Sequence, residues 1–94
     1  MKEYIDLYYP SIFAAISRLT RLPDRQDLDA LTRNVLADLW RQKEIFETER
    51  RKGAFIYKTM LYHIFSFLTE KGDMERISFL KKILPTNPDQ YITK

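Results

Sequence analysis

Apolar residues recur at intervals of three and four along most of the chain, which is the pattern of helices with one buried face. The first such run predicts a helix over about residues 3–22. Pro10 lies inside this run, and it either kinks the helix or forms its first turn, with residues 1–9 then partly separate. Pro23 disfavours helix at the residue before it, so residues 21–27 are predicted to be a connection.

A second helix follows, with Asp24 or Asp27 as its cap and an end near Lys43. Two adjacent apolar stripes give this helix a face wide enough to pack against two neighbours. The stripes consist of Leu28, Leu31, Val35 and Leu39, and of Thr32, Leu36 and Trp40. Residues 44–52 are polar apart from Ile45 and Phe46, and they are predicted to form a loop.

The third predicted helix carries apolar residues from Phe55 to Leu68 and is closed by Lys71 and Gly72, a cation in the last turn followed by a glycine. Met60, Ile64, Phe67 and Leu68 are expected to face inward; Lys58 and Tyr62 are candidates for the outer face, which Tyr57 and Phe65 could share.

A short fourth helix is predicted after Asp73, which can cap it, and Pro85 stops it. No strand alternation is visible, and the tail after Pro85 has no helical period. The sequence therefore predicts an all-α fold, a compact bundle of three long helices plus one short C-terminal helix. The domain is expected to span residues 3–84, with a loose tail or linker over residues 85–94.

Composition excludes several classes of protein. No apolar run approaches the roughly 18 residues that span a bilayer, and the first residues lack the features of a secretory signal, so we expect a cytoplasmic protein without a membrane partner. The chain has no cysteine and one histidine, His63, which gives no disulfide framework and no metal centre. The two glycines stand alone, so there is no phosphate-binding loop. We expect no enzyme activity, no cofactor and no small-molecule substrate.

Charge is distributed unevenly along the chain. Residues 1–49 contain seven Lys and Arg against nine Asp and Glu, whereas residues 50–94 contain nine against four. The stretch over residues 50–69 has four cations, Arg50, Arg51, Lys52 and Lys58, interleaved with aromatic residues that include Phe55, Tyr57 and Tyr62. Cations that follow phosphates and aromatic rings that stack on bases suit single-stranded nucleic acid. Aromatic residues at helical spacing also suit a core, and the pattern alone leaves both interpretations open.

The polar face of the second helix has two interpretations as well. It carries Asp27, Arg33, Asn34, Asp38 and Arg41, and such a face is either solvated or a docking surface. The paired carboxylates Asp27 and Asp29 are expected to complement the positive end of the helix dipole.

The order and spacing of these segments resemble region two of extracytoplasmic-function sigma factors, of the sigma-70 family of bacterial transcription initiation factors. The resemblance covers about residues 3–71. It rests on the pairs Tyr9-Pro10 and Leu19-Thr20, on Asp27, Asp29, Leu31, Val35, Leu36 and Trp40, and on the run Phe55, Ile56, Tyr57 and Lys58.

The resemblance implies a protein with two binding surfaces and no reaction chemistry of its own. One surface would dock on the clamp helices of the largest subunit of the RNA polymerase core: Asp27, Asp29, Ala30, Arg33, Asn34, Asp38 and Arg41. The other would bind the non-template strand of the promoter −10 element and help to melt it: Arg50, Arg51, Lys52, Phe55, Tyr57, Lys58 and Tyr62. An anti-sigma factor is a further partner that the resemblance suggests.

The chain departs from the family pattern within both surfaces. Ala30, Arg33 and Asn34 stand where the family has an aspartate, a glutamine and an acid, so an acidic docking face becomes neutral to basic. In the third helix Tyr62, Ser66 and Thr69 replace an asparagine, an aspartate and an arginine, and the family's rules for base recognition do not transfer. The alternative function is a sigma-like helical module that binds a protein partner and has lost promoter recognition.

Overall fold

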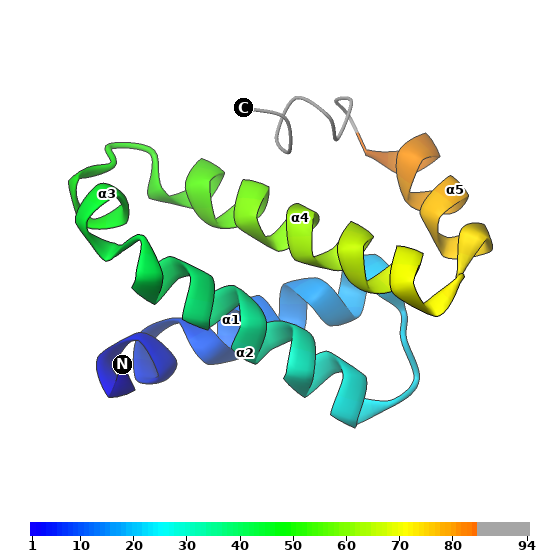
Figure 1. The fold of residues 1–94 in the computed structure, drawn as a ribbon, viewed down its shortest axis with the longest axis horizontal. Coiled ribbons are helices and arrows are strands. Elements are labelled where there is room, and N and C mark those ends of the chain that lie inside the picture. Colours follow the sequence, from blue (N-terminus) through cyan, green and yellow to red (C-terminus); the bar gives the residue numbers. More distant parts are fainter. Residues whose placement is uncertain (85–94) are drawn as a thin grey trace.

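The computed structural model describes residues 1–84, which form five α-helices and no strand (Figure 1). The helices are α1 (Lys2–Thr20), α2 (Arg25–Arg41), α3 (Lys43–Thr48), α4 (Lys52–Lys71) and α5 (Met74–Ile83). The all-α prediction is confirmed. The count of three long helices and one short one is incomplete, because α3 is an additional short helix. The predicted tail lies outside the described residues.

The three long helices surround one core. α2 contacts both α1 and α4, and α5 lies beside the C-terminal end of α4 and also contacts α1 (Figure 1). The predicted stripes of α2 are buried, with Trp40 half-buried at the end nearest α3. In α4, Met60, Ile64 and Leu68 are buried as predicted, and so is Phe65, one of the two residues whose side the period left open.

Helix α1 passes through Pro10 without a break, so residues 1–9 are not a separate segment. The proline is exposed on the outer side of the helix. The helix ends two residues earlier than predicted, at Thr20, because Arg21 adopts a left-handed conformation with φ 54°. That turn carries the chain from α1 into α2.

Local capping signals set three of the remaining helix ends. The side chain of Asp24 accepts a hydrogen bond from the Gln26 backbone N–H at 2.8 Å, so Asp24 rather than Asp27 is the cap of α2. Gly72 ends α4 with φ 71°, and Asp73 caps α5 by accepting from the Arg76 N–H. The predictions for Gly72 and Asp73 are confirmed.

The loop prediction for residues 44–52 is wrong over most of its length, because α3 occupies Lys43–Thr48. The cause is burial of Phe46, which is 1% exposed and packs its ring against Tyr4, Tyr8 and Phe55 at centroid distances of 5.5 to 5.8 Å. Tyr4 also donates to Glu47 Oε2 at 2.9 Å. Contacts with α1 and α4 therefore stabilise a helix in a segment whose local composition favours a loop.

No helix within residues 1–84 combines the length and the hydropathy that crossing a bilayer requires.

Candidate functional site

One polar face of α4 follows the helix from end to end. Its residues recur every three, four or seven positions, so they share one side of the helix. We call this face the α4 stripe: Arg51, Lys58, Tyr62, Ser66 and Thr69. All are exposed except Lys58, which is half-buried. The stripe runs from cations near the start of the helix, through an aromatic ring, to hydroxyl groups near its end.

The other predicted nucleic-acid residues are Arg50, Lys52, Phe55 and Tyr57. Lys52 Nζ donates to the backbone oxygens of Glu47 and Glu49 at 3.1 and 3.0 Å, so this cation closes the end of α3. Phe55 is half-buried against Phe46, and Tyr57 is half-buried against the core. Arg50 is exposed in the short connection before α4. Tyr62, at 48% exposure, is therefore the predicted aromatic residue whose ring is most open to a base.

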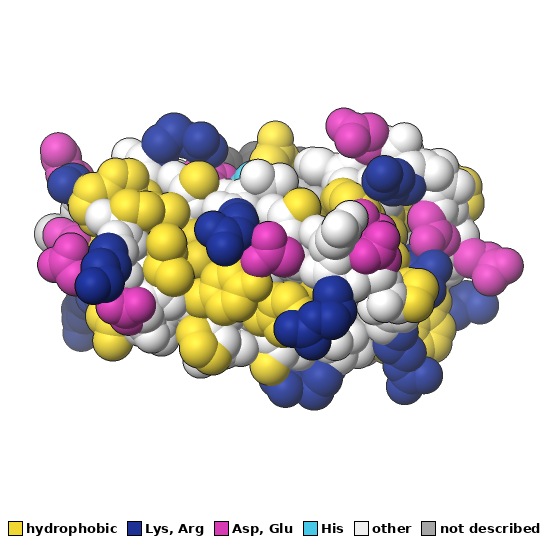
Figure 2. Space-filling model, turned by 90° about the horizontal axis from the view of Figure 1, so that it is seen from below, with side chains coloured by type: hydrophobic (Ala, Val, Ile, Leu, Met, Phe, Trp, Pro, Cys, Tyr) yellow, Lys and Arg dark blue, Asp and Glu magenta, His cyan; other side chains and the backbone are white. Residues whose placement is uncertain are grey.

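α1 and α2 together form one side of the molecule, and the exposed residues of α2 lie on that side. Four predicted docking residues are exposed there, and we call them the α2 face: Ala30, Arg33, Asn34 and Arg41. Seen from this side, cations and anions are both scattered around a central band of apolar side chains (Figure 2).

The partly exposed carboxylate of Asp29 binds two side chains of the same molecule. The Tyr9 hydroxyl donates to Asp29 Oδ1, and Arg33 Nε donates to Oδ2 at 3.0 Å. These two hydrogen bonds, the one from Tyr9 first, hold the pKa of Asp29 below its usual range. The Arg33 guanidinium also lies 5.8 Å from the centre of the Tyr9 ring. Tyr9, Asp29 and Arg33 thus form one cluster across the α1–α2 contact.

Asp38 turns inward, toward α4. Its Oδ2 accepts from His63 Nε2 at 2.8 Å, its Oδ1 accepts from Gln42 at 2.7 Å, and Arg41 lies 3.3 Å away. Burial opposes ionisation of this carboxyl, but the hydrogen bonds from His63 and Gln42 outweigh it and lower the pKa of Asp38. The hydrogen bond between Asp38 and His63 thus joins α2, which carries the α2 face, to α4, which carries the α4 stripe.

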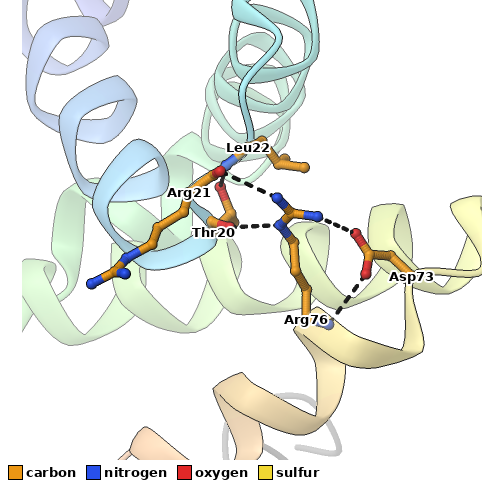
Figure 3. Close-up of polar contacts among 5 residues, drawn as sticks. All are labelled: Thr20, Arg21, Leu22, Asp73 and Arg76. Carbon is orange, nitrogen blue, oxygen red and sulfur yellow. Dashed lines mark hydrogen bonds and ion pairs between the residues drawn. The ribbon is translucent and has the colours of Figure 1, made fainter.

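A third polar cluster holds α5 onto the end of α1 (Figure 3). Arg76 Nε donates to the Thr20 backbone oxygen at 2.9 Å, and Nη2 donates to the Arg21 oxygen at 3.3 Å. Nη1 donates to Asp73 Oδ2 at 2.8 Å, and the bonds from Arg76 hold the pKa of Asp73 low. Arg76 therefore binds the last carbonyls of α1, where the helix dipole is negative.

Sequence reasoning missed these three clusters. The spacing of Asp73 and Arg76 is a readable local signal for their ion pair. No local signal joins Arg76 to Thr20, His63 to Asp38 or Tyr9 to Asp29, because each pair is at least 20 residues apart in the chain. Their partners depend on how the helices pack.

Two open hollows lie on the surface, one between the end of α1 and α5 and the other along α4. One, of about 310 Å³, is lined by Thr20, Arg21, Glu75, Arg76 and Phe79. The other, of about 440 Å³, is lined by Tyr62, Phe65, Ser66, Thr69 and Glu70, and so includes the second half of the α4 stripe. Within residues 1–84, no three acidic or histidine side chains come close enough together to hold a metal ion.

No protein-family model matches the chain, and neither the curated proteins nor the solved structures contain a match to it.

Proposed function

We propose that this chain is a sigma region-two domain, which binds the RNA polymerase core through the α2 face and single-stranded promoter DNA through the α4 stripe. The observation that carries the proposal is the α4 stripe itself, in which an exposed arginine and a half-buried lysine precede an exposed aromatic ring on one side of one helix. The domain would place DNA, and the polymerase would supply the chemistry.

The α4 stripe fits an unpaired strand better than a duplex. Tyr62 offers one exposed ring, and stacking of a base on such a ring contributes on the order of 1–3 kcal/mol. Lys58 lies one turn before Tyr62, and Arg51 lies about two turns before Lys58, so both can neutralise phosphates of the same strand. A duplex would keep its bases stacked on one another and would leave the Tyr62 ring without a partner.

The α2 face supports the docking half of the proposal by its position. It is exposed on the side of α2 that does not contact α4, so a protein seated there leaves the α4 stripe open to DNA. Its charge differs from that of the resembled family, since Arg33 is exposed and Asp29 is engaged by Tyr9 and Arg33. Docking would therefore use Arg33, Asn34 and Arg41 as donors to acceptors of the polymerase.

The docking half is tested by mixing the chain with bacterial RNA polymerase core and following co-elution in size-exclusion chromatography. We expect a complex at moderate salt that Arg33→Glu weakens and Lys2→Ala, an exposed change at the start of α1, does not. Absence of a complex at both low and physiological salt would refute this half.

The DNA half is tested by fluorescence anisotropy with short single-stranded oligonucleotides over a salt series. Lys58→Ala should reduce the slope of log affinity against log salt by roughly 0.7, the value for one phosphate contact on a single strand. Tyr62→Ala should weaken binding by roughly fivefold or more. Lys2→Ala serves again as the control, and unchanged binding in both α4 variants would exclude the α4 stripe as the DNA surface.

The second candidate is a protein-interaction module without promoter recognition. The observation that favours it is the exposure of Phe79 and Ile83, one turn apart on α5, with exposed fractions of 46% and 49%. Failure to bind single-stranded DNA at any salt, together with retained binding to the polymerase or another protein, would favour this function.

A further inference from the structure

The hollow between the end of α1 and α5 is lined by both helices. Its volume of about 310 Å³ is at the small end of the range for ligand sites. The lining consists of Thr20, Arg21, Glu75, Arg76 and Phe79. Thr20 and Arg76 are 56 residues apart in the chain, so the hollow exists only because α5 packs on the end of α1.

The walls of this hollow are held in place by the protein itself. Arg76 donates to the oxygens of Thr20 and Arg21, at 2.9 and 3.3 Å, and thereby holds α5 against the end of α1 (Figure 3). The Arg21 N–H donates to the Ser17 oxygen at 2.9 Å, which fixes the backbone of Arg21 in its left-handed conformation. A ligand that binds a preformed site loses less free energy to the ordering of that site.

Two opposite charges at the hollow have no partner within residues 1–84. The Arg21 guanidinium points away from Arg76, and no side chain of this part of the chain binds it (Figure 3). The exposed carboxylate of Glu75 has no hydrogen bond or ion pair either. Arg76 adds positive charge, since its guanidinium has more N–H donors than the three bonds that it makes. A free cation and a free anion at one hollow suit a ligand that carries both charges.

Phe79 gives the hollow an apolar surface. Its side chain is 46% exposed, and within residues 1–84 no other ring and no cation packs on it. Phe79 lies one turn after Glu75 and therefore on the same side of α5. An apolar group of a ligand that covered this ring would remove both surfaces from water, which stabilises the complex.

The lining selects among small ligands. A phosphate would meet the Glu75 carboxylate, and a purely apolar molecule would take the two charges out of water without pairing them. An α-amino acid carries a carboxylate and an ammonium on the same carbon as its side chain. With an apolar side chain it offers one group each to Arg21, Glu75 and Phe79, and the first two of these contacts are charge-assisted hydrogen bonds.

We propose that this hollow binds a free α-amino acid with an apolar side chain. The carboxylate accepts from Arg21, the ammonium donates to Glu75 and the side chain lies on Phe79. Because the ligand bridges the end of α1 and α5, its binding also opposes the detachment of α5. The site lies apart from the α2 face and the α4 stripe, and it does not depend on the proposed function.

An NMR titration of the whole chain with leucine tests the site. We expect saturable changes of the amide shifts at the lining residues and their neighbours, with a Kd on the order of 1 mM. Arg21→Gln and Phe79→Ala, both changes of exposed side chains, should each raise this Kd about fivefold or more. Arg50→Gln is the matched control, because Arg50 is an exposed arginine between α3 and α4, at the other end of the molecule from α5 (Figure 1).

Two relatives of leucine test the chemistry of the ligand. N-acetylleucine lacks the ammonium and glycine lacks the apolar side chain, so each should bind about fivefold more weakly than leucine. Glu75→Gln should bring the affinities for leucine and N-acetylleucine together, because it removes the acceptor that distinguishes them. At about ten times the Kd of leucine, hydrogen exchange of the α5 amides should slow about tenfold.

The outcomes divide as follows. Shift changes at the hollow that both Arg21→Gln and Phe79→Ala weaken, together with slower exchange of α5, support the site. Shift changes elsewhere, or changes that neither variant affects, overturn it. Equal affinities of the wild type for leucine and N-acetylleucine overturn the assignment of a free amino acid, because Glu75 would then contribute nothing. Absence of any saturable change overturns the whole proposal.

Discussion

Replacing Arg76 by alanine should detach α5 from the rest of the domain before the domain unfolds. Three hydrogen bonds are lost, to the Thr20 and Arg21 oxygens and to Asp73 (Figure 3). A hydrogen bond to a charged group contributes about 1.5–3 kcal/mol when it is shielded. The side chain of Arg76 is 36% exposed and its bond to Arg21 is long, so water replaces part of each contact. We therefore expect a total loss of about 2 kcal/mol.

This loss is large for a helix held by few apolar contacts. The buried residues of α5 are Ile77 and Leu80, each of which contributes about 1.5–3 kcal/mol. Removing Arg76 thus takes away a substantial part of what keeps α5 in place. The opening constant of α5 should rise roughly 30-fold, while the core of α2 keeps its protection. The pKa of Asp73 should also return toward its usual value, because Arg76 is the cause of its depression.

Native-state hydrogen exchange, resolved by helix, measures this effect directly. Amides of α5 should exchange faster in Arg76→Ala, and amides of α2 should not. Arg18→Ala is the matched control, because Arg18 is an exposed arginine in the last turn of α1 and makes no bond to α5. Equal exchange of α5 in the wild type and in Arg76→Ala would refute the reasoning, since it would mean that Ile77 and Leu80 hold α5 without the guanidinium.

Two further predictions concern buried ionisable groups. His63→Ala should lower the free energy of unfolding, measured in urea at pH 7, by about 1 kcal/mol. The same change should raise the pKa of Asp38, which an NMR titration of the carboxyl group would detect. An unchanged pKa would contradict the hydrogen bond between the two side chains. In the wild type this pKa lies below the unfolded value of about 3.9, so the stabilisation by Asp38 is present above pH 4 and lost as pH falls through the folded value. Burial and the bond to Glu47 raise the pKa of Tyr4 to about 12, so the folded state favours the neutral phenol, and stability should decline from about pH 10 to pH 12. Tyr4→Phe should reduce this alkaline decline but not abolish it, because the hydrogen bond to Asp29 also raises the pKa of Tyr9. Urea midpoints at pH 8 and pH 11 measure the change, and a wild-type profile in the variant would exclude Tyr4 as a source of the decline.

The parts of the fold that could be predicted from the sequence are those set by neighbouring residues. Gly72 ends α4 and Asp73 caps α5 through contacts within a few residues, and the period of apolar side chains in α2 identifies its buried face. α3 could not be predicted in this way. Its one buried side chain, Phe46, is packed by the ring of Tyr4 from α1, far from it in the sequence, and by Phe55 of the next helix.

In the candidate surfaces, too, the sequence predicts what depends on one helix and not what depends on contacts between helices. Exposure of Tyr62 and Arg33 follows from helical period, and both residues lie where the period places them. The same period places Asp38 on the polar side of α2, but His63 of α4 binds its carboxylate. A helical period describes one helix at a time, so it cannot show that a polar residue at the margin of a face is engaged by the next helix.

The cluster of Tyr9, Asp29 and Arg33 determines what kind of partner the α2 face can bind. The ion pair between Asp29 and Arg33 is exposed, and such pairs contribute at most about 1 kcal/mol. An acidic group of a partner can therefore attract Arg33 at little cost, because Tyr9 continues to donate to Asp29 after Arg33 has moved. A basic group that seeks Asp29 must instead displace both Tyr9 and Arg33 and approach a guanidinium. The geometry thus favours acidic partner groups over basic ones at this site, opposite to the preference of an acidic docking face. For the proposed docking on RNA polymerase, charge reversal of Arg33 should consequently weaken the complex more than neutralisation of Asp29.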